Sequence, residues 1–423
     1  MGNCSFDQKT LHAQLLELLR EFRRFGMTEA GGVTRLAASD EEKEARDHLC
    51  VWLKNHGFTV LIDPIGNIFG VLDFGLRDNC RAFYCGSHLD SQPEGGHFDG
   101  VLGVVCACIG SLFLKAKIER GELEPAYRYF VVACWTGEEG ARFQPSLIGS
   151  SVFTGRLALD KAWDLQDSNQ IQLKQALIES GYLGTDKPPP PEHYLELHIE
   201  QGSFLERSGN KIGLIEACWG AKKIRLSVTG KADHTGPTPM EERRDALLAA
   251  SLLVVEIKRI YTASEDVLYS SVGRMTLHPN SPNTVVDNAE LWIEFRSASS
   301  AALLFAIREL ETRLLAIADQ TGCTLGITNR ETRNVTKFDA VALDLAAQAL
   351  DETKTPYQRL DTIAGHDAIC LQDICPSTLL FAPSKDGITH SPFEFTSDED
   401  VCAAFDGMTI ALSAIMTRPG NAS

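Results

Sequence analysis

The sequence predicts an α/β protein in which one domain, with a mainly parallel mixed sheet flanked by helices, is split around an inserted α+β domain of two layers. Helix-like and strand-like segments alternate through the first half of the chain, which is typical of a parallel sheet covered by helices. From about residue 217 the strands alternate apolar and polar residues, which indicates a sheet with one wet face. After about residue 335 the first pattern returns. We therefore assign residues 1–216 and 333–423 to one domain and 217–332 to the insert.

The individual elements follow from hydrophobic periodicity. Apolar residues at helical spacing predict helices over residues 11–22, 41–56, 101–117, 245–261, 301–318, 341–350 and 398–416. Short apolar or alternating runs predict strands within residues 58–71, 81–85, 126–135, 194–199, 224–229, 291–296, 323–328 and 378–382. The four consecutive prolines at 188–191 predict a stiff, extended surface connection.

Composition limits the function classes. The 423 residues include 40 Lys and Arg against 57 Asp and Glu, a formal net charge of −17. Such a chain repels phosphate backbones and anionic lipid, so we expect neither a nucleic acid nor a membrane as partner. With 44% hydrophobic and 23% charged residues it is an ordinary globular sequence. The longest near-apolar run, residues 101–114, is too short for a membrane span and predicts a buried helix.

Cysteine usage and the N-terminus indicate the compartment. The 12 cysteines are scattered and form no Cys-x-x-Cys pair, so we interpret them as reduced, packed thiols and not as metal ligands. The start of the chain, Met1 to Phe6, lacks the basic and apolar regions of a secretory signal. A cytoplasmic location is the expectation.

Four segments carry His, Asp or Glu directly after a strand-like run. Sites in open α/β sheets form beyond the carboxyl ends of the strands, so distant segments meet there. The first segment spans residues 85–100 and holds His88, Asp90 and Asp99. His88 is a good metal ligand, and Asp90 is spaced to orient its imidazole. Asp99 precedes the helix predicted at 101, so the alternative is a helix N-cap.

The second segment, residues 135–143, holds the adjacent carboxylates Glu138 and Glu139. Paired carboxylates after a buried strand are costly unless something neutralises them. A metal ion would hold one and leave the other as a general base. The alternative is a solvated loop with Arg142 as the counter-ion.

The last two segments each add a histidine. His198 shares a strand face with Glu196 and Glu200, and His390 lies in a loop after the strand at 378–382. Taken alone, either histidine is explained equally well by a role in the core or on the surface as by metal binding. Together the segments offer three histidines and two carboxylates, a set that suits two divalent ions bridged by one carboxylate. Nitrogen and oxygen ligands favour zinc, with manganese, cobalt or nickel as alternatives.

These motifs resemble those of the hydantoinase/carbamoylase amidases, a branch of the zinc-dependent aminoacylase and carboxypeptidase-G-like clan. The matching strings run in order from residue 86 to 392: GSHLDSQPEGGHFDG, WTGEEGARF, LELHIEQG, GKADHTGPTPM, PNSPNTV, IEFRS, AGHDA and GITHSP. The resemblance therefore covers nearly the whole chain, and the ordered combination is highly specific.

The resemblance implies a role for each matching residue. His88, Asp99 and His198 would hold one metal ion, and Asp99, Glu139 and His390 the other, with Asp99 as the bridge. Glu138 would be the general base that takes a proton from the bridging water. It also implies that the insert is a lid that carries the homodimer contact. His234 would stabilise the oxyanion and reach into the partner subunit's site. Substrate binding would fall to Gln201, Asn283 and Arg296, and His366 would have a supporting role near the site.

The residues themselves agree with the roles of Arg296 and His234, although each residue also has another explanation. Arg296 lies on the wet face of its strand, where a guanidinium fork matches a substrate carboxylate. The alternative is a salt bridge with Glu294. His234 lies in a loop rich in Gly and Pro, where a histidine faces solvent or ligand, and the alternative is a plain surface histidine. Three positions depart from the family pattern, which puts the substrate preference in question: Gly137, Glu294 and Ile363.

We therefore expect a homodimeric, metal-dependent amidohydrolase that cleaves an N-carbamoyl-L-α-amino acid to the amino acid, ammonia and carbon dioxide. The alternatives within the family are a β-ureidopropionase and an allantoate amidohydrolase. An aminoacylase or dipeptidase is a weaker one, because peptidases of the clan commonly have a carboxylate at the place of His198. A metal-free binding or scaffold protein on the same fold is the alternative outside enzymes.

Overall fold

The structure is a computed structural model that describes residues 8–76 and 81–417. The start of the chain and two of the cysteines, Cys4 and Cys80, lie outside the described residues. The chain divides into two compact units, of which the second comprises Ala217–Lys337 and Asp361–Ile363. The ten described cysteines are free thiols, and nine of them are buried.

The first unit is built on a mixed sheet whose centre is parallel. The strand order is β1 (Thr59–Ile62), β2 (Ile68–Asp73), β4 (Tyr129–Trp135), β3 (Ala82–His88), β5 (Pro191–Ile199), β13 (Ser377–Ala382), β6 (Ile212–Cys218) and β11 (Thr336–Lys337), with β12 (Tyr357–Thr362) paired to β6. By the bounds of the two units, β11 and the last two residues of β6 and of β12 belong to the second unit. Neighbours β4, β3, β5 and β13 run parallel, and the outer pairs run antiparallel. The predicted fold class is confirmed. Strands β6 and β12 were not predicted.

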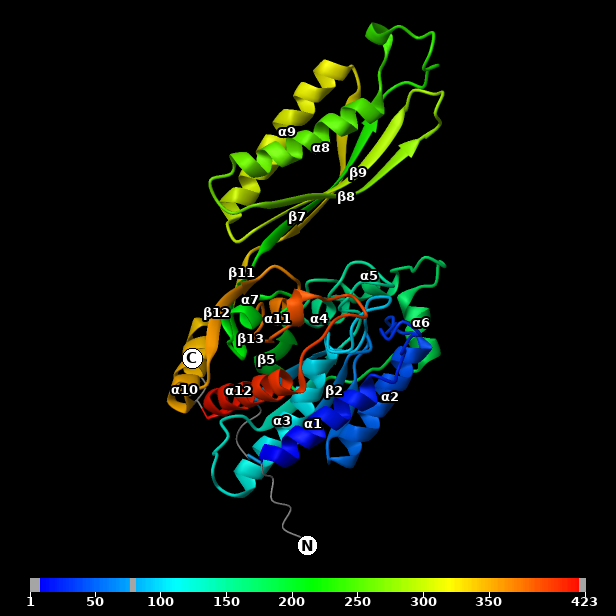
Figure 1. Ribbon diagram of the computed structural model, residues 1–423. Helices are drawn as coiled ribbons and strands as arrows, with labels where there is room; N and C mark the ends of the chain where they lie inside the picture. The colour runs from blue at the N-terminus through cyan, green and yellow to red at the C-terminus, as the bar shows by residue number, and fades with distance from the viewer. Residues whose placement is uncertain (1–7, 77–80, 418–423) are drawn as a thin grey trace. The chain divides into compact units, whose positions relative to one another are not determined.

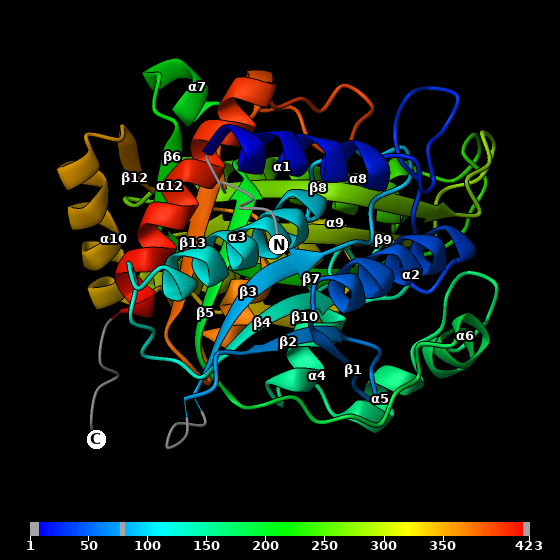
Figure 2. The same ribbon diagram turned by 90° about the horizontal axis from the view of Figure 1, so that it is seen from below.

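Helices cover this sheet. The longer ones are α1 (Gln8–Phe22), α2 (Asp40–Asn55), α3 (Val101–Glu119), α10 (Ala340–Thr353) and α12 (Asp398–Met416). Figure 2 shows α3 and α12 lying across the central strands, and α1 packs on both of these helices. Shorter helices lie in the connections: α4 (Ile148–Phe153), α5 (Leu159–Trp163), α6 (Leu173–Ser180), α7 (Phe204–Ser208) and α11 (Asp367–Leu371).

Helix α3 is the core helix of this unit. Among the described residues it alone is long and apolar enough to pass a test for a membrane span, yet 78% of that apolar window is buried inside the protein. It packs on β3, β4 and β5, whose residues are buried on both faces. Its burial from both sides explains why its sequence is apolar all round.

The second unit is a two-layer α+β sandwich. Its antiparallel sheet has the order β10 (Thr324–Arg333), β7 (Gly220–Thr229), β9 (Asn288–Ser297) and β8 (Tyr269–His278). Figure 1 shows α8 (Ala246–Ala263) and α9 (Ser300–Thr321) side by side on one face of this sheet. The buried faces of both layers form one hydrophobic core. Strand β8, which was not predicted, is mostly exposed or half-exposed and so lacks a strong apolar pattern.

The second unit extends past residue 332, where the sequence placed its end. Strand β10 continues to Arg333, and the unit also takes in the end of β12. The Thr362 carbonyl accepts the Trp219 N–H at 2.8 Å, and the Ile363 carbonyl accepts from Arg333 Nη2 at 2.7 Å. Long-range hydrogen bonds of this kind have no signature in a hydrophobic pattern.

Candidate metal centre

The chemistry-bearing side chains of the first unit gather at the carboxyl ends of its parallel strands. His88 is the last residue of β3, and His198 is the next-to-last residue of β5. Glu138 and Glu139 follow β4, and His390 lies in the loop after β13. Because these four strands are parallel neighbours, their ends meet at one edge of the sheet.

One group of ligand atoms comes from His88, Asp99 and His198, all three buried. Asp99 Oδ1 lies 3.5 Å from His88 Nε2 and 3.1 Å from His198 Nε2. Asp99 precedes α3, but the N-cap of that helix is Gly100 and no side chain caps it, so the N-cap alternative is wrong. Gly100 has φ 68°, and a Cβ there would lie 2.4 Å from the His88 ring. Glycine is therefore needed for the loop to bring Asp99 beside His88.

The tautomers of the two buried histidines suit a cation. His88 Nδ1 lies 2.9 Å from the Asp90 carbonyl, and His198 Nδ1 lies 3.0 Å from the Ile199 carbonyl. A carbonyl only accepts, so each Nδ1 carries a proton, and Nε2 is the ring nitrogen that faces Asp99. His88 Nε2 is buried without a hydrogen-bond partner. An orphaned buried nitrogen beside a carboxylate fits a metal ion that the two would share.

Asp90 supports the site in a way that differs from the sequence prediction. Its backbone carbonyl orients His88, and its carboxylate oxygen is 3.6 Å from His88 Nδ1. The carboxylate instead accepts the backbone N–H groups of Glu138 and Glu139, each at 3.1 Å. Asp90 therefore joins the loop after β4 to the end of β3.

A second group comes from Asp99, Glu139 and His390. His390 Nε2 lies 3.5 Å from Asp99 Oδ2 and 3.3 Å from Glu139 Oε2. The side chain of Gln92 donates to Glu139 Oε2 at 3.0 Å, and its backbone N–H donates to the other oxygen at 3.2 Å. His390 is 46% exposed, so this group is open to solvent on one side. Asp99 contributes one oxygen to each group, which is the geometry of a bridging carboxylate.

The electrostatics of the site centre on carboxylates. Burial opposes ionisation of Asp99, but the three histidines around it, His198 above all, outweigh burial and hold the pKa of Asp99 well below its usual range. Burial raises the pKa of Glu138 well above its usual range. Glu138 Oε2 lies 3.6 Å from His88 Nε2, so it faces the same space as the ligands. A carboxylate with a raised pKa in that place is suited to exchange protons.

Arg142 is not the counter-ion of the paired glutamates. Its Nε binds Asp167 at 3.0 Å, and its Nη1 donates to the carbonyls of Ala37 and Ala38. That alternative from the sequence is therefore wrong, and Glu138 and Glu139 are left facing the histidines.

Two further predicted residues of the first unit touch the ligands. Gln201 Nε2 donates to Asp99 Oδ2 at 2.8 Å, so its amide holds the shared carboxylate. The buried His366 ring packs edge-on against the His198 ring, with centroids 4.5 Å apart. Sequence reasoning missed Gln92, Thr389 and Glu394, which hold the ligands by hydrogen bonds, because single polar loop residues carry no pattern.

The other three predicted residues lie in the second unit. His234 is exposed, and its Nδ1 accepts the Gly236 N–H at 3.0 Å, so its Nε2 carries a proton and is a donor. Asn283 is exposed, and its carbonyl accepts the Thr235 N–H at 3.3 Å, which ties the two loops together. Arg296 Nε lies 3.1 Å from Glu294 Oε1, and its Nη1 donates to the Ile363 carbonyl at 3.1 Å.

The chain is similar to known proteins over nearly its full length. The model of peptidase family M20/M25/M40 matches residues 84–413. An N-carbamoyl-L-amino acid amidohydrolase of Geobacillus stearothermophilus is 30% identical, with 92% of this chain and 95% of the relative covered. A ureidoglycolate hydrolase of Arabidopsis thaliana is 28% identical, with 98% and 88% covered.

A solved structure shows the same architecture. The crystal structure of a hydantoinase/carbamoylase family amidase from Burkholderia multivorans superposes with a TM-score of 0.84, at 32% identity and 98% coverage of both chains. These matches cover both units and every segment that carries the candidate ligands. The chain therefore belongs to peptidase family M20/M25/M40 and, within it, to the hydantoinase/carbamoylase amidases, as an amidohydrolase of the carbamoylase and allantoate amidohydrolase group.

Proposed function

We propose that this enzyme hydrolyses the carbamoyl C–N bond of an N-carbamoyl-L-α-amino acid and gives the amino acid, ammonia and carbon dioxide. The observation that carries the proposal is the convergence of His88, Asp99, His198, Glu139 and His390, with Glu138 facing the same space. A binding or scaffold protein would have no use for a buried cluster of carboxylates and histidines, because the burial of such groups destabilises the fold.

The donor set fits two divalent cations. His88, Asp99 and His198 would hold one, and Asp99, Glu139 and His390 the other. Zinc suits these nitrogen and oxygen ligands, with manganese, cobalt or nickel as alternatives. When bound, such ions acidify a water molecule and polarise the scissile carbonyl.

The residues of the chain supply the proton transfers and the orientation. Glu138 takes a proton from the attacking water and delivers it to the leaving amine, for which its raised pKa prepares it. Asp90 holds the backbone of Glu138 in place. His234, with its protonated Nε2, donates to the oxyanion that develops on the carbamoyl carbon.

Recognition of the substrate falls to the second unit and to Gln201. Arg296 binds the substrate carboxylate, and Asn283 binds the carbamoyl group. The family name and the carbamoylase relatives support a carbamoyl substrate. The insert acts as a lid that closes over the substrate and carries the contact of a homodimer. The enzyme works in the cytoplasm, in line with its free thiols.

A substrate panel tests the proposal. Metal-free enzyme is reconstituted with zinc, manganese, cobalt or nickel, and ammonia release is measured on N-carbamoyl-L-α-amino acids, N-carbamoyl-β-alanine, allantoate and ureidoglycolate. The proposal expects the highest kcat/KM on a carbamoyl-α-amino acid. A higher value on carbamoyl-β-alanine, allantoate or ureidoglycolate would reassign the substrate, and activity without added metal after complete removal would overturn the metal-dependent mechanism.

A further inference from the structure

A buried carboxylate beside the candidate metal centre has no part in the proposed chemistry. Glu394 is 2% exposed and lies four residues after His390. Its Oε1 accepts the backbone N–H groups of Phe98 and Asp99 at 3.0 and 3.1 Å. Its Oε2 lies 3.1 Å from the hydroxyl of Thr389. Glu394 thus contacts two of the three loops that supply the ligands of the second group, those of Asp99 and His390.

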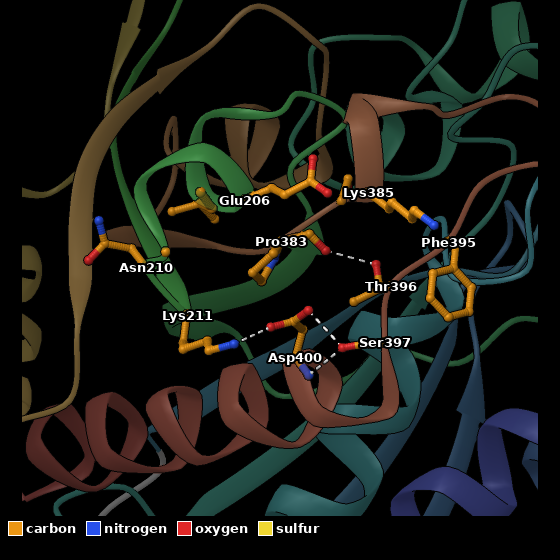
Figure 3. A pocket seen from close by; sticks show the side chains of 12 residues that line it. Glu206, Asn210, Lys211, Pro383, Lys385, Phe395, Thr396, Ser397 and Asp400 are labelled. Atoms are coloured by element: carbon orange, nitrogen blue, oxygen red, sulfur yellow. Dashed lines mark hydrogen bonds and ion pairs between the residues drawn. The ribbon is translucent and has the colours of Figure 1, made fainter.

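Glu394 is itself fixed by the closed base of the His390 loop. The Phe395 carbonyl accepts the Lys385 N–H at 2.9 Å, and the Thr396 hydroxyl donates to the Pro383 carbonyl at 2.9 Å. Figure 3 shows this closure, with Pro383 and Lys385 on one side and Phe395 and Thr396 on the other, beside a cavity of about 190 Å³. The two ends of the His390 loop are therefore hydrogen-bonded to each other, and Glu394 lies next to this closure.

The Asp99 loop leaves room for this carboxylate. A Cβ at Gly96 would lie 2.0 Å from Glu394 Oε1, although the backbone of Gly96 is not in the left-handed region that requires glycine. The glycine is thus explained by the space that Glu394 occupies. Residues 96 and 394 are far apart in the sequence, so their fit is a tertiary feature of the site.

The side-chain oxygen of Asp99 is part of the same network. Asp99 Oδ2 accepts from Gln201 Nε2 at 2.8 Å and lies 3.1 Å from the Thr389 hydroxyl. Thr389 therefore touches both carboxylates, Asp99 and Glu394. Its neighbour in the chain is His390, so a displacement of Glu394 moves the backbone of Asp99 and the loop of His390 together.

We propose that Glu394 is a positioning residue that sets the spacing between Asp99 and His390 and so determines how tightly the Asp99–Glu139–His390 group holds its cation. The proposal rests on the proposed metal-dependent function. It assigns no contact between Glu394 and the cation or the substrate. The His88–Asp99–His198 group depends on Glu394 less, because its histidines come from β3 and β5.

Zinc binding to metal-free protein tests the proposal, by competition with a chromophoric chelator. Wild type is expected to bind two ions per chain. In Glu394→Ala the weaker ion should bind about 10- to 100-fold less tightly, the range found for groups that hold metal ligands, and the tighter ion should change by less than about threefold. Glu394→Gln should restore binding to within about threefold, because its amide oxygen accepts both N–H groups and its nitrogen donates to Thr389.

A double-mutant cycle with Gly96→Ala provides a second test that does not depend on Glu394→Ala alone. Gly96→Ala should weaken the same ion, since its methyl group displaces Glu394. In the Glu394→Ala background the same substitution should cost little, because the methyl group enters vacated space, so the two effects should not add. If Glu394→Ala fails to fold, Gly96→Ala carries the same expectation.

Asp63→Ala is the matched control. Asp63 is also buried, at 5% exposure, and accepts two backbone N–H groups, those of Ile65 and Asn67, but it touches no candidate ligand. It should lower Tm and leave both zinc affinities unchanged. Equal zinc affinities in wild type and Glu394→Ala, or equal losses in Glu394→Ala and Asp63→Ala, would overturn the proposal. A wild type that binds no zinc would instead overturn the proposed function.

Discussion

The two units hold their functional side chains in opposite ways. In the first unit His88, Asp99 and His198 are at most 4% exposed, and hydrogen bonds fix each of them. In the second unit His234 and Asn283 are exposed, and the Arg296 side chain is 32% exposed. The first unit is thus organised in advance for a reaction that tolerates little displacement. The second presents donors that a substrate has still to meet. We therefore expect mutations of Glu138 in the first unit to change turnover, and mutations of Asn283 or Arg296 in the second to change substrate binding.

Glu138→Gln tests this division most strongly. The amide has the shape of the carboxylate but cannot take a proton, so kcat should fall by about 1,000-fold or more, while KM and metal content stay near wild type. Ammonia release gives kcat, and atomic emission gives the metal content. Activity within about tenfold of wild type would show that Glu138 is not the base.

Removing one histidine from each group sharpens the comparison inside the first unit. His198→Ala deletes a buried ligand that water replaces poorly. The affinity of that group for its zinc ion should therefore fall by more than the 10- to 100-fold (about 1.4–2.7 kcal/mol) typical of residues that only hold a metal ligand in place. His390→Ala should weaken the other ion less, because His390 is 46% exposed and water can take its place. Chelator competition ranks the two; the reverse order would contradict the distinction between a buried and an open group.

Arg296→Ala tests the second unit. A charge-assisted hydrogen bond to the substrate carboxylate contributes about 1.5–3 kcal/mol, so KM for the carbamoyl amino acid should rise by about 10- to 150-fold. The kcat should change little, since the proposed role of Arg296 is to bind the substrate carboxylate and not the reacting carbonyl. An unchanged KM would argue against the carboxylate-binding role.

Glu294→Gln should have the smallest effect, and in the opposite direction. Glu294 lies 3.1 Å from Arg296 Nε and competes with a substrate carboxylate for that edge of the guanidinium. A partly exposed ion pair contributes about 0.2–1 kcal/mol, so its removal should lower KM by up to about fivefold. KM is best measured by steady-state kinetics at low salt, where the charges are least screened. A raised KM would show that Glu294 instead orients Arg296 for the substrate.

The fold could be predicted from the sequence wherever the burial of an element produces a regular pattern of apolar residues. Strands β3, β4 and β5 are almost wholly buried and rich in apolar residues, and β9 alternates residue by residue, so all four were found. Strand β12 and helix α11 were missed. β12 is half-exposed and interrupted by charges, and α11 spans only five residues, fewer than two turns.

The candidate metal ligands could be predicted from the sequence, but the residues that hold these ligands by hydrogen bonds could not. His88, Glu139 and His390 follow strands, and the sheet topology brings strand ends together without further information. The Asp90 carboxylate lies 3.6 Å from His88 Nδ1, but nothing local shows that it also accepts two N–H groups from residues 138 and 139. Arg296 was left open between a substrate and Glu294, and the structure shows the ion pair with Glu294.

The boundary of the second unit matters to anyone who would shorten this protein. Because the unit includes Asp361–Ile363, the chain passes between the two folding units at 216/217 and 337/338 and again on either side of this tripeptide. Replacing 217–337 with a short linker would strip the carbonyls of Thr362 and Ile363 of the donors Trp219, Arg296 and Arg333. A truncated metal-binding core would therefore need residues 361–363 redesigned as a surface turn.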